Sequence, residues 1–494
     1  MIKNRKLTLR SAFMVTAMSK YSRIIINLVF TIILARLLTP EDYGIVAVTN
    51  VFINFFAVFS DMGISVGVIQ NKELTDEDNN NIYSFSVYFG IVLSAIFALF
   101  SFLMARFYQN NIYIPIGFML SVSLLFTTLN MVPNALLMKE KKLGALAVRA
   151  VISAILSGII TVILAAFGWK YYALVVSNIF GSCFIYIWNK MYVNLHFKKV
   201  LSMQSIKKIF SFSLFQFAFN FVNYFSKNMD NILTGRYMGA KKLGYYDKAF
   251  TLTQHPISAL ANVVAPVLHP FLSEHSKEKE YIYKKHIDIV RIFLIFGFFV
   301  SGILFFYSED IIMVLYGERW AGSAPCLKWL GVSLWAQLSV SCSSAIYQSL
   351  GDTKKLFMAG SFNAGISMLC IILGIYSKHI LILSQMVSAA YFIHFFIINY
   401  ILVKLIIKKS VFQFVLSFWK EWLMAIILFV FGNIRFFCIE NNILNLFAGV
   451  CYLGMVYFIT LVITGEGKAL MDMVGVKKFR ILAWKSKRNK GKIE

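Results

Sequence analysis

Two stripes of polar residues lie inside otherwise apolar segments, 200 residues apart in the chain. The first stripe consists of Thr16, Lys20, Arg23, Asn27 and Thr31, and the second of Gln216, Asn220, Asn223, Lys227 and Asn231. Steps of three and four residues keep each stripe within an arc of about 80° on a helix. Polar and cationic groups among Phe, Ile, Leu and Val are costly in a membrane unless they face a wet cavity or a partner. We therefore expect two similar halves that line one polar cavity, whose positive charge suits an anionic ligand.

Lys20 and Arg23 are the cations best placed to bind that anion. They lie about 4.5 Å apart along one helix axis, and together they offer phosphate a bidentate fork and a point charge. The alternative is an internal ion pair with Asp61. We favour phosphate binding because three cations face only two acids across the first, second and seventh predicted spans.

The second stripe is richer in amides. Asn220 and Asn223 suit sugar hydroxyls, but they equally suit contacts between helices. Lys227 lies one helical turn from Asp230, so it can either pair with this acid or bind the ligand. The substrate-binding candidates are therefore Lys20, Arg23, Asn27, Asn220, Asn223 and Lys227.

Three titratable residues are candidates for coupling transport to a proton or sodium gradient. Asp61 and Asp230 are acids within predicted spans, and His255 is a residue type that titrates near neutral pH. For the histidine, a hydrogen-bonded packing role is the alternative.

The composition indicates a membrane protein. Of 494 residues, 59% are hydrophobic and 14% are charged, whereas soluble proteins carry about 25% charged residues. Apolar runs of about 20 residues are long enough to cross a bilayer. We predict an all-α polytopic fold with about fourteen spans, near 12–34, 44–69, 82–105, 112–138, 145–168, 171–189, 209–234, 243–272, 289–308, 325–350, 356–376, 380–403, 418–437 and 443–464.

The net charge of +25 is a topology signal rather than a nucleic-acid patch. Lys and Arg gather in the N-terminus, the even-numbered loops and the basic tail, which predicts that both termini are cytoplasmic. The cations near the N-terminus and the apolar run that follows them read as an uncleaved first span.

A repeat of 200 residues extends past the stripes. ARLLTPEDYG at 35–44 aligns without a gap on GRYMGAKKLG at 235–244. Six spans in each repeat give both halves the same orientation, related by an axis along the membrane normal. We predict an N-lobe at 1–200, a C-lobe at 201–408, and two further spans with a basic tail at 409–494.

No motif for catalysis or metal binding is recognisable. The chain has no Walker motif and no nucleotide-binding glycine loop, and its six cysteines lie singly. We expect neither an enzyme nor a cofactor or metal site. The acidic run at 73–78 is expected to be simply solvated.

Two segments resemble the Wzx-type polysaccharide-repeat flippases of the multidrug/oligosaccharidyl-lipid/polysaccharide exporter superfamily. They are ILARLLTPEDYGIVAV at 33–48 and FSDMGISVGVIQ at 59–70; GRYMGAKKLGYYDKA at 235–249 is similar to the same family. The resemblance implies a multi-pass protein of the bacterial inner membrane with two lobes and a cationic cavity.

The resemblance also implies a function. Such proteins translocate undecaprenyl-diphosphate-linked oligosaccharides for O-antigen, capsule or exopolysaccharide biosynthesis, by alternating access. The implied partners are this anionic lipid-linked oligosaccharide, membrane lipids, and a polysaccharide polymerase or other pathway proteins. The alternatives are an ion-coupled multidrug exporter of the same superfamily and a membrane glycan polymerase or ligase, although the basic stripes and the short loops argue against both.

Overall fold

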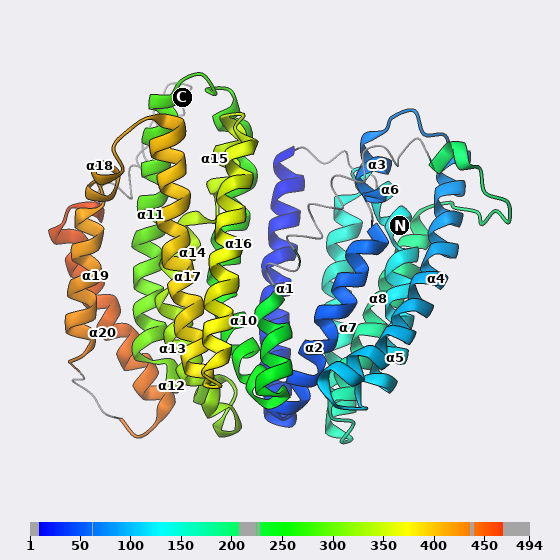
Figure 1. Ribbon diagram of the computed structural model, residues 1–494, viewed down its shortest axis with the longest axis horizontal. Coiled ribbons are helices and arrows are strands. Elements are labelled where there is room, and N and C mark those ends of the chain that lie inside the picture. Colours follow the sequence, from blue (N-terminus) through cyan, green and yellow to red (C-terminus); the bar gives the residue numbers. More distant parts are fainter. Residues whose placement is uncertain (1–8, 62, 207–223, 225–227, 435–438, 468–494) are drawn as a thin grey trace, which may run out of the picture. The chain divides into compact units, whose positions relative to one another are not determined.

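The protein is helical throughout its described part. The computed structural model describes residues 9–61, 63–206, 224, 228–434 and 439–467. Every regular element in these ranges is a helix (Figure 1), which confirms the predicted fold class. Within the same ranges, ten helices are long and apolar enough to cross a membrane. The count of fourteen spans stays a prediction, and the predicted span near 209–234 lies mostly outside the described residues.

The chain divides into two compact units. One comprises residues 1–248 and 316–320, and the other comprises 249–315 and 321–494. The division falls inside one long helix, α10 (Ala240–Ser273). The lobe boundaries expected from the repeat stay a prediction.

Eight helices of the first unit precede α10. They are α1 (Leu9–Leu37), α2 (Pro40–Asp61), α3 (Ile64–Gln70), α4 (Asp76–Tyr108), α5 (Tyr113–Leu129), α6 (Met131–Lys139), α7 (Leu143–Ala166) and α8 (Tyr171–Tyr192). Residues 228–238 are also helical. Within this unit α4 packs on α5, α1 on α7, and α8 on both α5 and α7.

The second unit continues α10 with longer and shorter helices. They are α11 (Lys279–Phe306), α12 (Ser308–Leu315), α13 (Ala324–Val332), α14 (Leu334–Val340), α15 (Ser343–Ser349), α16 (Thr353–Tyr376), α17 (Ile380–Tyr400), a π-helix (Ile401–Ile407), α18 (Val411–Leu416), α19 (Trp419–Gly432) and α20 (Asn442–Ile463). A 3-10 helix (Glu318–Ser323) begins in the first unit and ends in the second. The segment predicted as one span at 325–350 is thus three short helices. An ion pair of 2.8 Å between the half-buried Arg291 and the buried Glu421 ties α19 to α11.

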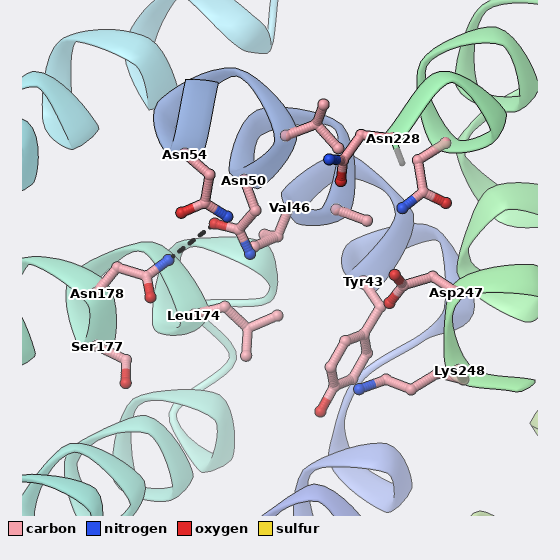
Figure 2. A pocket seen from close by; sticks show the side chains of 13 residues that line it. Tyr43, Val46, Asn50, Asn54, Leu174, Ser177, Asn178, Asn228, Asp247 and Lys248 are labelled. Atoms are coloured by element: carbon pink, nitrogen blue, oxygen red, sulfur yellow. Dashed lines mark hydrogen bonds between the residues drawn. The ribbon is translucent and has the colours of Figure 1, made fainter. Parts of the chain in front are cut away.

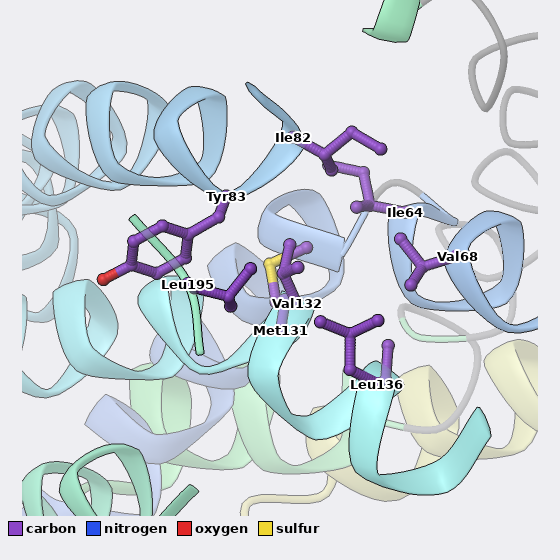
Figure 3. Close-up of a cluster of buried hydrophobic side chains, with 9 residues drawn as sticks. Ile64, Val68, Ile82, Tyr83, Met131, Val132, Leu136 and Leu195 are labelled. Atoms are coloured by element: carbon purple, nitrogen blue, oxygen red, sulfur yellow. The ribbon is translucent and has the colours of Figure 1, made fainter. Parts of the chain in front are cut away.

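An apolar cluster holds the short helices of the first unit together (Figure 3). Ile64 and Val68 of α3 meet Val132 and Leu136 of α6, and Ile82 of α4 completes the contact. Burying such side chains is worth about 1.5–3 kcal/mol each. This cluster fixes the start of α4 against α6.

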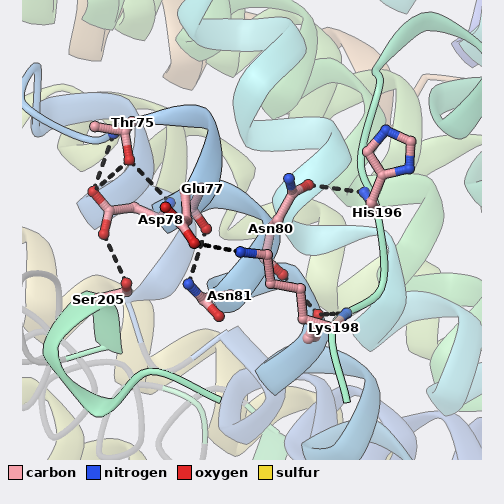
Figure 4. A network of polar contacts seen from close by, with 9 residues as sticks. Thr75, Glu77, Asp78, Asn80, Asn81, His196, Lys198 and Ser205 are labelled. Carbon is pink, nitrogen blue, oxygen red and sulfur yellow. Dashed lines mark hydrogen bonds and ion pairs between the residues drawn. The ribbon is translucent and has the colours of Figure 1, made fainter. Parts of the chain in front are cut away.

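The start of α4 corrects the expectation of a purely solvated acidic run. Thr75 and Asp78 form a capping box, in which each side chain accepts a hydrogen bond from the other's backbone N–H. The Asp78 carboxylate is buried and also accepts a hydrogen bond of 2.7 Å from Ser205 (Figure 4). Glu77 alongside it is exposed and pairs with Lys198 at 2.6 Å. Asp78 is not simply solvated, because its carboxylate accepts hydrogen bonds at the helix N-terminus, where backbone N–H groups have no partner within the helix.

α2 and α10 cross at a reciprocal glycine contact. The two helices begin at Pro40 and Ala240, which are equivalent positions of the 200-residue repeat. A methyl group on Gly44 would lie 1.8 Å from the carbonyl oxygen of Ala240, and one on Gly244 would lie 1.9 Å from that of Pro40. Each glycine therefore packs on the first residue of the other helix, as in a two-fold symmetric interface. Only glycine allows the backbones to approach this closely.

Trp320 is fully buried beside this crossing. Its indole N–H donates a hydrogen bond of 2.8 Å to the carbonyl oxygen of Ala35. Its ring meets that of Tyr43 edge to face, with the centroids 5.3 Å apart. The turn between α1 and α2 is thereby held by a residue from more than 270 positions further along the chain.

Candidate functional site

α1 presents three distinct faces. One face packs on α7, where Ser19 donates a hydrogen bond of 3.0 Å to the carbonyl oxygen of Ala147 and Phe30 packs against Gly158. Large apolar side chains are exposed on a second face: Met18, Ile25 and Val29. At about 100° per residue, this second face lies about 80–120° around the helix from the packing face.

The third face is the polar stripe. Lys20, Arg23 and Asn27 are exposed, and they lie about 40–100° from the packing face in the opposite direction to the apolar face. The helix thus exposes an apolar side and a cationic side that point away from each other. This is the pattern of a helix that stands between lipid and a water-filled space.

The two cations of the stripe are not neutralised by acids in the described part of the chain. No ion pair there joins Lys20 or Arg23 to a carboxylate. Asp61, the alternative partner, instead accepts a hydrogen bond of 3.2 Å from the backbone N–H of Ser65. The stripe therefore keeps its positive charge.

A third cation, Arg149 of α7, extends this cationic face. Its guanidinium donates hydrogen bonds of 3.1 Å to Asn134 and 2.7 Å to Asn189, and Asn189 in turn donates to Asn130 at 2.7 Å. It lies near enough to Arg23 for the two charges to interact. Amides hold Arg149 in place without cancelling its charge, so three cations gather on α1 and α7.

A polar pocket of about 340 Å³ lies elsewhere in the same unit. α2 forms its middle with Asn50 and Asn54, and α8 forms one side with Asn178 (Figure 2). Asn178 donates a hydrogen bond of 3.1 Å to Asn50. The other side comes from the helical residues 228–238 and the start of α10.

The start of α10 supplies the charged residues of this pocket. Asp247 and Lys248 both line it. Lys248 is 7% exposed, and its Nζ lies 3.6 Å from the centroid of the Tyr43 ring, a close cation–π contact. Among the described residues, no hydrogen bond or ion pair satisfies this ammonium group.

The structure describes only some of the other predicted site residues. Asn220, Asn223 and Lys227 lie outside the described residues. Asp230 is buried near the start of α10 and accepts a hydrogen bond of 2.8 Å from Tyr246.

Asp61 and His255 are the other two coupling candidates. Asp61 is the last residue of α2, about 31 Å along that helix from its crossing with α10. His255 belongs to the second unit.

Several site residues were missed at the sequence level. Arg149 is not among the predicted binding residues, although a cation inside an apolar helix is a signal that could have revealed it. Asn50 and Asn54 are four residues apart on one helix face, a spacing that could have revealed them. Asp247 and Lys248 gave no such signal, because the residues of α2 that complete the pocket lie about 200 positions earlier in the chain.

The comparison with protein families identifies the chain. The model of a family described as polysaccharide biosynthesis protein matches residues 33–325, which is more than half of the sequence. The chain belongs to this polysaccharide biosynthesis family.

Curated relatives share modest identity with the chain. The teichuronic acid biosynthesis protein TuaB of Bacillus subtilis is 24% identical over 319 residues, covering 64% of this chain and 66% of TuaB. The lipopolysaccharide biosynthesis protein WzxC of Escherichia coli is 25% identical over 314 residues, covering 62% of this chain and 63% of WzxC. The chain thus spans just under two thirds of the length of these relatives.

A solved structure has the same fold. The lipid II flippase MurJ, in an inward closed conformation, superposes with a TM-score of 0.71, covering 92% of this chain and 100% of MurJ. The sequence identity is 16%, so the likeness shows the fold alone. Together with the helices that are long and apolar enough to cross a membrane, it makes this protein a multi-pass membrane protein with the fold of MurJ.

Proposed function

We propose that this protein is a flippase for undecaprenyl-diphosphate-linked oligosaccharides in the bacterial inner membrane, serving surface polysaccharide biosynthesis. Family membership and the names of the relatives support the pathway, and the fold supports transport. The observation that carries the proposal is the cationic face of Lys20, Arg23 and Arg149, which has no carboxylate partner among the described residues and points away from the apolar side of α1.

The cationic face lowers the cost of moving a diphosphate out of water, which is the main energetic barrier to such transport. A diphosphate cannot enter hydrocarbon alone, because desolvating an ion costs far more than a few contacts return. Arg23 offers the diphosphate a planar fork of donors and Lys20 a mobile point charge. Asn27, and Asn220, Asn223 and Lys227 from the other stripe, complete the proposed replacement of its water shell. The lipid tail stays in the bilayer while the two halves alternate in access.

The proposed orientation places both termini in the cytoplasm. The turn at 38–39 then faces the periplasm, and the cationic face lies about 20–25 Å from that turn along α1. The diphosphate would thus enter from the cytoplasmic side and meet the cations before it reaches the helix crossing. Translocation breaks no covalent bond, so the protein needs no catalytic residue for this function.

Energy coupling to a proton or sodium gradient is part of the proposal. Asp230 is the candidate with the strongest structural support, because its carboxylate is buried and touches Tyr246 next to the helix crossing. Asp61 and His255 remain candidates at other positions in the chain.

The proposal is tested by replacing Lys20 and Arg23 with alanine in a strain that depends on this protein. We expect surface polysaccharide to fall at least tenfold while lipid-linked oligosaccharide accumulates on the cytoplasmic side. The Lys20→Arg, Arg23→Lys double variant keeps both charges and should retain most of the transport.

Arg106→Ala is the matched control, because this exposed cation lies at the end of α4, away from the stripe. It should leave the amount of polysaccharide unchanged. Normal polysaccharide from the double alanine variant, at normal membrane abundance of the protein, would refute the proposed role of the stripe.

A further inference from the structure

The side chain of Lys248 is 7% exposed, and its ammonium group has no hydrogen-bond acceptor among the described residues. The group carries three N–H donors, and the Tyr43 ring covers only one side of it. An ammonium group on a largely buried side chain is stabilised when hydrogen-bond acceptors reach it. Because Lys248 lines the pocket, the occupant of the pocket is the natural source of these acceptors.

The other polar groups of the pocket call for an occupant that both donates and accepts. The amides of Asn50, Asn54 and Asn178 each carry donors and acceptors. The carbonyl oxygen of the Asn231 side chain is buried and has no hydrogen-bond partner among the described residues. This set matches hydroxyl groups, which also act in both roles.

The charge balance of the pocket sets it apart from the cationic face. Asp247 and Lys248 carry opposite charges, so the pocket is neutral overall. Asp247 disfavours a phosphate group in this space, and Lys248 disfavours a bare metal cation. An uncharged polar ligand is therefore the best match.

We infer that this pocket is a sugar subsite, which binds one neutral, hydroxyl-bearing ring of the transported glycan between Asp247 and Lys248. The inference rests on the proposed function and adds where the glycan is held. Adjacent hydroxyls of the ring donate to the Asp247 carboxylate and accept from the Lys248 ammonium. The cavity of about 340 Å³ is at the lower end of the range for small-molecule sites, so it suits a single ring rather than a whole oligosaccharide.

The depth of the pocket fits this arrangement. Asn54 lies fourteen residues into α2 and Arg23 fourteen residues before the end of α1, each about 21 Å from the turn at 38–39. Tyr43, at the other end of the pocket, lies about 5 Å from the turn. The pocket thus extends from the depth of the cations toward the turn, where sugars attached to a bound diphosphate would lie.

The test compares two lipids on the purified full-length protein by native mass spectrometry. One is undecaprenyl diphosphate, and the other is undecaprenyl diphosphate that carries a neutral oligosaccharide isolated from the strain of origin. We expect the unaltered protein to bind the sugar-bearing lipid about tenfold more tightly. Lys248→Met should abolish this preference and leave the affinity for the bare lipid unchanged. Lys241→Met, an exposed lysine of the same helix, is the matched control and should retain the preference.

A second variant keeps the test decisive if Lys248→Met does not fold. Asp247→Asn keeps the shape of the side chain and should weaken the preference severalfold, even if Lys248→Met does not fold. An undiminished preference in either folded variant overturns the inference. A loss of affinity for both lipids alike also overturns it, because the pocket would then be an anion site. One further outcome would overturn the inference in favour of a cation site. In it, sodium chloride stabilises the protein, Asp247→Asn removes this stabilisation, and the sugar preference stays intact.

The two proposals fail in distinguishable ways. If neither lipid binds to the unaltered protein, the flippase proposal fails and the subsite fails with it. If both bind equally, only the subsite fails. The Lys20→Ala, Arg23→Ala variant should lose affinity for both lipids, which separates the diphosphate site from the sugar site.

Discussion

Replacing Gly44 with alanine should destabilise the first unit through the crossing of α2 and α10. The new methyl group would lie 1.8 Å from the carbonyl oxygen and 2.5 Å from the carbonyl carbon of Ala240. These distances are inside ordinary van der Waals contact by about 1.5 Å and about 1 Å. A backbone carbonyl cannot rotate away as a side chain can, so the helices must separate. We expect a cost of about 3 kcal/mol, the upper part of the usual range for overpacking.

Thermal unfolding of the purified protein in detergent measures this cost. For a unit of about 250 residues, each kcal/mol shifts Tm by about 2–4 °C, so Gly44→Ala should lower Tm by about 6–12 °C. Gly244→Ala should act alike, because its methyl group meets Pro40 at 1.9 Å. Gly360→Ala is the control: it is exposed on α16, and its methyl group would meet nothing within 4 Å. The control should leave Tm unchanged or raise it slightly, since alanine favours helix.

The double variant tests whether the two glycines belong to one contact. Once the helices have separated to accommodate the first methyl group, the second should cost little, so Gly44→Ala with Gly244→Ala should be only slightly worse than either alone. Fully additive losses would show two independent contacts. A Gly44→Ala protein with the Tm of Gly360→Ala would refute the close crossing itself.

Two further predictions concern stability and use the same unfolding measurement. Arg291→Leu leaves the buried carboxylate of Glu421 without its donor and should cost about 3–5 kcal/mol. Adding Glu421→Leu should recover most of this loss. An unchanged Tm in the single variant would contradict the ion pair. Asp78→Ala should cost about 1 kcal/mol through the lost helix cap, whereas Glu77→Ala should cost less, because its pair with Lys198 is exposed. The reverse order would contradict the capping role.

The long helices were predictable because their apolar runs are continuous. The span predicted at 145–168 is α7, observed at Leu143–Ala166, and that at 443–464 is α20, observed at Asn442–Ile463. Averaged hydropathy does not reveal local breaks of the backbone. It therefore missed the break at Asn130 between α5 and α6 and the division of 325–350 into three helices.

The site was predictable only where its pattern is local in sequence. Lys20 and Arg23 are separated by one helical turn, so their shared face followed from spacing alone. Lys248 belongs to the pocket because the crossing of α2 and α10 brings it onto Tyr43, a contact between residues 205 positions apart. No periodicity encodes such a contact. The repeat did align Gly44 with Gly244, but the structure was needed to show that each packs on the other's helix.

The two polar regions of the first unit differ in charge balance, and this difference carries the functional argument. Lys20, Arg23 and Arg149 leave an uncompensated positive charge among the described residues, whereas Asp247 and Lys248 cancel. A free sugar would match only the pocket, and inorganic phosphate would match only the cations. A ligand with a charged group joined to neutral hydroxylated rings matches both regions at once. A glycan carried on a lipid diphosphate has this composition, and its two parts should lose affinity independently when the two regions are mutated.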